Sequence, residues 1–90
     1  MSIDVKISPI LARYSGNQRT AKVKGSNVGE CLDHLVTQFP DLKKALFDKN
    51  GRLHRYIDVY VNQKSTYPEE LAKTVKDGDN LQIMMIIAGG

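Results

Sequence analysis

Only one long stretch of this chain, residues 28–39, repeats its apolar residues at the spacing of an α-helix. The apolar residues of the repeat are Val28, Leu32, Leu35, Val36 and Phe39. Before the repeat, Asn27 can accept hydrogen bonds from the free N–H groups of a first helical turn, and Glu30 stands at the capping-box spacing. After it, Pro40 ends the helix. A helix with one apolar side must pack on another layer, so we predict that it lies across one face of a sheet.

The sheet is predicted from segments in which apolar and polar residues alternate. Residues 3–7 and 19–24 alternate in this way and are joined by turn-forming residues, so we expect an N-terminal hairpin. Residues 56–61 give the clearest strand, and residues 81–87 give the last one, after a tight turn at residues 77–79. The side chains expected to point into the core are Ile3, Val5, Ile7, Ala21, Val23, Ile57, Val59 and Val61.

Three shorter elements complete the predicted order. A helical piece spans residues 42–46, a brief strand lies near residues 65–67, and residues 68–71 form one helical turn that begins at a proline. The order strand, strand, helix, strand, short strand, strand is typical of an α+β domain of the β-grasp type, with a mixed sheet of roughly four to five strands. Ninety residues hold one core, so we expect a single domain over residues 1–90, with residues 88–90 as a flexible functional tail.

Composition excludes several classes of protein. Hydrophobic residues make up 41% of the chain and charged residues 26%, which are values close to the average for folded globular domains. No run approaches the about 18 consecutive apolar residues that cross a bilayer, and the N-terminus lacks the basic start and apolar run of a signal peptide. We therefore expect a cytoplasmic protein with no membrane partner.

The charge pattern is weakly basic. The net charge is +3, but the lysines and arginines are scattered along the chain and are not interleaved with aromatic residues. We therefore do not expect nucleic acid to be a partner. The densest basic region is either a solvated surface or a docking site for an acidic partner, and it contains Lys43, Lys44, Lys49, Arg52 and Arg55.

The candidates for a catalytic site are Cys31, His34 and His54. Cys31 and His34 stand three positions apart on the predicted helix, where a nucleophile and its base can be neighbours. However, a cysteine beside a leucine is more often a buried apolar residue, and one cysteine makes neither an internal disulfide nor a four-cysteine metal site. The histidines show no ligand spacing for a metal. We therefore predict a protein that is not an enzyme and binds no metal.

The last strand carries an apolar face that the helix cannot cover. In residues 81–87 the odd positions face the core, so Met84 and Ile86 face the other side of the sheet. Tyr56 and Tyr60 share that side. Exposed apolar patches on small domains mark places where other proteins bind. We interpret these four residues as a docking site, and cover by loops or by a second copy of the chain is the alternative.

The chain ends in Ala88-Gly89-Gly90, which has no side chain larger than a methyl group. Such a segment can enter a slot too narrow for other residues, and its terminal carboxylate is an anion at neutral pH. An anionic carboxylate is a poor electrophile until an enzyme converts it to a mixed anhydride such as an acyl-adenylate. We therefore interpret the tail as a substrate, and a frayed chain end is the alternative.

Three segments share their pattern with one protein family: Val-Tyr-Val-Asn at residues 59–62, residues 71–79 closing in Asp-Gly-Asp, and the terminal Ala88-Gly89-Gly90. Together they resemble the ubiquitin-like sulfur carrier proteins, the group that contains the small subunit of molybdopterin synthase and the thiamin sulfur carrier. The resemblance spans essentially the whole chain and implies a β-grasp fold.

The resemblance also implies a function for the tail. Gly90 is expected to be adenylated with ATP by an E1-like activating enzyme, converted to a thiocarboxylate, and used by a sulfur-accepting synthase. The carrier itself performs no catalysis and binds no cofactor, because the partner enzyme uses the ATP. In this family an interface hydrophobic residue stands six places before the final glycine, and its equivalent here is Met84.

The branch of the family stays open. The chain lacks the prolines that often precede the terminal glycines of the molybdopterin subunit, and it has Met85 and Ile86 instead. Residues 52–56, Arg-Leu-His-Arg-Tyr, look like carriers that serve cysteine or homocysteine synthesis, in which a metalloprotease releases the product. His54 and Arg55 are then secondary contacts, and an ordinary exposed loop is the alternative. The rival function is a ubiquitin-like protein modifier or a non-catalytic interaction module.

Overall fold

The computed structural model describes residues 2–86 of the chain. The strands are β1 (Ile3–Ile7), β2 (Thr20–Val23), β3 (Ile57–Val61), β4 (Lys64–Ser65) and β5 (Asn80–Met85). The helices are α1 (Val28–Gln38) and α2 (Leu42–Leu46), and two 3-10 turns are η1 (Ala12–Ser15) and η2 (Glu70–Ala72).

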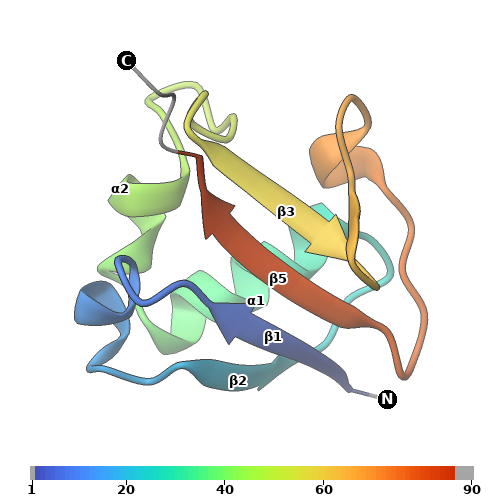
Figure 1. Ribbon diagram of the computed structural model, residues 1–90, viewed down its shortest axis with the longest axis horizontal. Coiled ribbons are helices and arrows are strands. Elements are labelled where there is room, and N and C mark those ends of the chain that lie inside the picture. The colour runs from blue at the N-terminus through green and yellow to red at the C-terminus, as the bar shows by residue number, and fades with distance from the viewer. Residues whose placement is uncertain (1, 87–90) are drawn as a thin grey trace.

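The five strands form one mixed sheet in the order β2-β1-β5-β3-β4. β1 and β5 run parallel, with Val5 opposite Leu81, and the other neighbouring pairs are antiparallel. Figure 1 shows β5 between β1 and β3, with α1 crossing one face of the sheet. The predicted β-grasp fold, with one main helix on a mixed sheet, is confirmed.

The core lies between α1 and the sheet, where the predicted alternation puts it. Val5, Val59 and Ile83 are fully buried on the sheet, and Leu32 and Leu35 are fully buried on α1. Burying a leucine side chain stabilises a fold by about 1.5–3 kcal/mol. An isolated helix of 11 residues is only marginally stable in water, so α1 is stabilised mainly by this packing and less by helix propensity.

The start of α1 follows the predicted cap with one change. The Asn27 side chain accepts a hydrogen bond from the Glu30 N–H at 2.7 Å, as expected of an N-cap residue. In a capping box, Glu30 accepts in return from the N–H of the N-cap residue. Here it accepts from the N–H and the hydroxyl of Ser26, at 2.8 and 2.7 Å. These bonds hold the pKa of the Glu30 carboxyl below its ordinary value.

The turn before β5 is tied to the end of β3. Gly78 has a φ of 91°, a left-handed conformation that favours glycine. Asp79 accepts from the N–H of Lys76 at 2.9 Å and from the side-chain amide of Asn62 at 3.0 Å. The Asn62 amide oxygen in turn accepts from the N–H of Asn80, the first residue of β5, at 3.0 Å. The side chains of Asn62 and Asp79 therefore fix where β5 begins.

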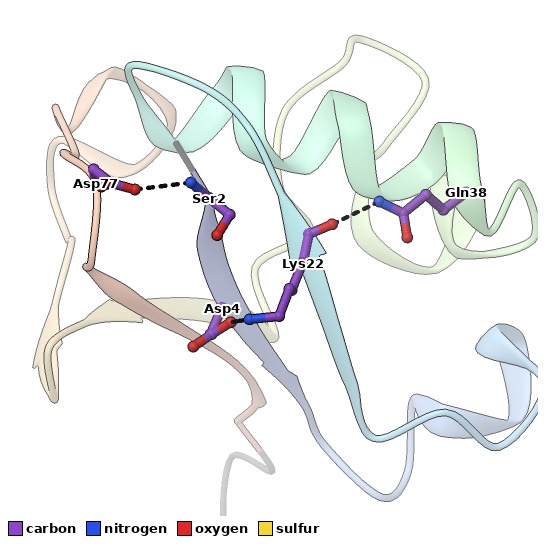
Figure 2. A network of polar contacts seen from close by, with 5 residues as sticks. All are labelled: Ser2, Asp4, Lys22, Gln38 and Asp77. Atoms are coloured by element: carbon purple, nitrogen blue, oxygen red, sulfur yellow. Dashed lines mark hydrogen bonds and ion pairs between the residues drawn. The ribbon is translucent and has the colours of Figure 1, made fainter.

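Polar contacts also tie β1 and β2 to their neighbours (Figure 2). The N–H of Ser2 donates to Asp77 at 2.8 Å, and Lys22 of β2 forms an ion pair with Asp4 of β1 at 2.8 Å. The side chain of Gln38, the last residue of α1, donates to the carbonyl of Lys22 at 2.8 Å. This last bond joins the end of the helix to the edge strand.

The boundaries of the smaller elements differ from the prediction. η1 replaces part of an expected loop. η2 covers Glu70–Ala72, whereas the helical turn was expected at residues 68–71, and β4 covers Lys64–Ser65 instead of residues 65–67. β5 ends at Met85, and Ile87, which was predicted to end it, lies outside the described residues. Within residues 2–86, no helix has the length and apolar character that a bilayer span needs.

The N-cap gives a direct test of the fold. Replacing Asn27 with alanine removes the acceptor of the Glu30 N–H, and we expect the free energy of unfolding to fall by about 1 kcal/mol, measured in urea. Asn50→Ala is the matched control, because Asn50 bonds Asp48 through its backbone N–H and not its side chain. Equal stability of the two variants would contradict the assigned role of Asn27.

Candidate functional site

The candidate docking patch consists of Tyr56, Tyr60, Met84 and Ile86. The alternation of β5 turns Leu81 and Ile83 into the core and Met84 to the opposite face. Met84 is 36% exposed, Tyr56 43% and Ile86 48%, whereas Tyr60 is half-buried. Three of the four side chains are thus available to a partner on the face that α1 does not cover.

The strand register gathers three of these residues at one end of β5. The N–H of Ile86 donates to the carbonyl of Tyr56, and Met84 stands opposite Asp58, two residues along each strand on the same face. Tyr60 pairs with Gln82, one step further from Ile86 on the same face. The patch is therefore densest at the last residues of the chain that the structure describes.

This sheet face also carries cationic residues, which were not part of the predicted docking site. A groove of about 400 Å³ lies beside Met84, and its lining includes Lys6, Arg19, Thr20 and Gln82. We call it the basic groove, because two of these side chains are cationic. Alternation alone places Lys6 on the open face, but only the parallel pairing of β1 with β5 sets it beside Gln82. That pairing was not evident from the sequence.

The tail residues Ala88, Gly89 and Gly90 lie outside the described residues. Their predicted role in threading and activation therefore stays a prediction. The described chain reaches Ile86, which stands four positions before Gly90 in the sequence.

His54 is not part of an ordinary exposed loop. Its ring is half-buried and stacks on the ring of Tyr56, with a centroid separation of 4.9 Å and an angle of 9° between the planes. Its Nε2 lies 2.9 Å from the carbonyl oxygen of Lys44 in α2. Arg55 is exposed. Of the two predicted secondary contacts, His54 is therefore held by its neighbours, and Arg55 faces solvent.

The other candidate catalytic residues, Cys31 and His34, have structural roles. Cys31 is fully buried, and burial raises the pKa of its thiol to about 11, with smaller contributions from the charges of Glu30 and Asp79. Nδ1 of His34 accepts a hydrogen bond from the N–H of Lys24 at 2.8 Å. Among residues 2–86 no group of three or more histidine, cysteine or carboxylate side chains is placed to hold a metal ion.

A model described as the ThiS family matches residues 12–90 of the chain. This chain belongs to the ThiS family. The sulfur carrier protein CysO of Mycobacterium tuberculosis is 30% identical to it over 93 residues, which cover 100% of both chains.

Solved structures give the same result for this ThiS-family chain. A chain of the Amycolatopsis orientalis BexX/CysO complex is 36% identical, with a TM-score of 0.85 over 98% of this chain and 99% of that one. The small archaeal modifier protein 1 of Haloferax volcanii is 28% identical, with a TM-score of 0.85 over 96% and 98% of the two chains. The predictions of a sulfur carrier and of a non-catalytic protein are confirmed by the ThiS family and by the CysO relatives.

The thiol of Cys31 provides a test of its buried, structural role. A shift of its pKa from 9.0 to about 11 lowers the thiolate fraction about 100-fold at neutral pH. We expect Ellman's reagent at pH 8 to react at least that much more slowly with the native protein than with the protein in urea. Equal rates would contradict the burial of Cys31.

Proposed function

We propose that this carrier transports sulfur as a thiocarboxylate on Gly90. A carboxylate oxygen of Gly90 attacks the α-phosphorus of ATP on an activating enzyme, which forms the acyl-adenylate and releases pyrophosphate. A sulfur nucleophile then attacks the acyl carbon and displaces AMP, so that one oxygen atom is replaced by sulfur. The chain supplies the carboxylate and the docking surface, and the partner supplies ATP and the sulfur donor.

The exposed patch at the end of β5 is the observation that carries this proposal. Ordering a tail of three or four residues in an enzyme slot costs about 1–2 kcal/mol per residue. Burying a few hundred Å² of apolar surface, at about 25 cal/mol per Å², offsets that cost. Met84 and Ile86 stand four and two positions before Ala88 in the sequence, so the surface that provides this free energy and the carboxylate that reacts belong to one segment.

The basic groove supports an inference about the surface of the activating enzyme. Lys6 and Arg19 lie beside Met84, and both side chains are exposed. An enzyme surface that fits this face has an apolar pocket for Met84 and Ile86, with carboxylates opposite Lys6 and Arg19. Such charges raise the rate of association and make it depend on salt.

We assign the sulfur to the biosynthesis of cysteine or homocysteine, because the curated relatives are CysO sulfur carriers. The implied partners are the activating enzyme, a sulfur-accepting synthase and a metalloprotease that releases the product. Transfer to a molybdopterin or thiamin precursor is the competing outcome. Protein modification is a second candidate function, favoured by the likeness to small archaeal modifier protein 1.

Incubation with an activating enzyme, ATP and sulfide tests the thiocarboxylate. We expect the intact mass to rise by the difference between sulfur and oxygen. Deletion of Gly90 abolishes the gain and leaves the thermal midpoint unchanged, because the buried core residues of the described chain end at Ile83. Absence of the gain, together with conjugates on lysines of other proteins, would establish the modifier function instead.

Charge substitutions test the docking surface. Met84→Glu places a charge where an apolar contact is expected, and we expect KM for the carrier in the activation assay to rise at least about tenfold. Lys6→Glu should raise KM more at low salt than at high salt. Tyr67→Glu is the matched control, because Tyr67 is 74% exposed but follows β4 at the far edge of the sheet. An equal effect of Met84→Glu and Tyr67→Glu would reject the assigned face.

A further inference from the structure

His54 connects α2 to the end of the described chain through a series of direct contacts. It lies 10 positions after Lys44 in the sequence and 32 positions before Ile86. The series runs from the carbonyls of α2 to His54, from His54 to Tyr56, and from Tyr56 to Ile86. Tyr56 and Ile86 both belong to the docking patch.

The first contact fixes the imidazole ring. The last carbonyls of a helix have no partner inside the helix. His54 supplies partners for two of them in α2: its N–H donates to the carbonyl of Leu46 at 2.9 Å, and its Nε2 lies 2.9 Å from that of Lys44. A carbonyl only accepts, so Nε2 carries the hydrogen in this contact. One bond thus holds the backbone of His54 against α2, and the other holds its ring there.

The second contact fixes the ring of Tyr56. The two rings are nearly parallel, at 9°, and their centroids are 4.9 Å apart. Tyr56 is 43% exposed, and it precedes β3, so the strand itself does not fix its side chain. Its carbonyl accepts the hydrogen bond of the Ile86 N–H, one residue beyond the end of β5. The residue that stacks on His54 is therefore also the backbone partner of Ile86.

We propose that His54 is a positioning residue for recognition by the activating enzyme: it holds the ring of Tyr56 in the orientation that the enzyme surface binds. This inference rests on the proposed function and adds a residue that acts through Tyr56 rather than by touching the reacting carboxylate. An exposed tyrosine that is already oriented loses less side-chain entropy on docking. The effect therefore falls on KM for the carrier and leaves kcat of adenylation unchanged.

Two substitutions separate the stack from the hydrogen bond. His54→Gln keeps an N–H donor for Lys44 and loses the aromatic ring, so we expect KM to rise about fivefold. His54→Phe loses the donor but keeps a ring against Tyr56, so we expect its KM to stay close to that of the wild type. His34→Ala is the matched control, because His34 also bonds a backbone group, the N–H of Lys24, but does so on α1. It should change stability without changing KM.

The assay is thiocarboxylate formation with the activating enzyme, ATP and sulfide, followed by intact mass, with thermal midpoints recorded for every variant. A wild-type chain that gains no sulfur refutes the proposed function, and the inference fails with it. When the wild type is converted, a raised KM for His54→Gln with near wild-type KM for His54→Phe supports the inference. Equal KM values for wild type and His54→Gln, or KM changes that only follow the thermal midpoints, overturn it and leave the proposed function intact.

Discussion

The parallel pairing of β1 with β5 determines most of what this molecule presents to its partners. It places the last strand in the middle of the sheet, with Val5 opposite Leu81 on one side and Val59 opposite Ile83 on the other. A central strand is hydrogen-bonded along both edges, so its alternation is fixed relative to α1. The same pairing that buries Ile83 therefore exposes Met84 near the end of β5.

The family pattern found in the sequence has a structural reason. Asn62 ends the Val-Tyr-Val-Asn segment, and Asp79 ends the Asp-Gly-Asp turn, and their side chains bond each other at 3.0 Å. Asn62 also accepts from the N–H of Asn80, where β5 begins. The two segments lie far apart in sequence and meet at the start of the strand whose other end carries the docking patch. They set the register from which the exposure of Met84 follows.

The sequence predicted what depends on local pattern. The strand faces follow from alternation, and the start of α1 follows from Asn27, because both are decided by residues a few positions apart. What the sequence did not predict depends on partners distant in the chain. Lys6 borders Met84 only because β1 pairs with β5, and His54 stacks on Tyr56 while its Nε2 reaches α2. The alternation pattern carries no information about which strands pair.

The side chains that could take part in catalysis are engaged in the fold of this carrier. The thiol of Cys31 is buried with a raised pKa, the ring of His34 bonds the N–H of Lys24, and the ring of His54 is committed to Lys44 and Tyr56. Burial therefore withholds the Cys31 thiol from nucleophilic chemistry, and each histidine has one ring nitrogen bonded to a backbone group. Under the proposed function, the Gly90 carboxylate is an anion and a poor electrophile until it is activated. Under the proposed function, its chemistry begins when the activating enzyme attaches AMP, and specificity resides in the surface around Met84 rather than in the reacting group.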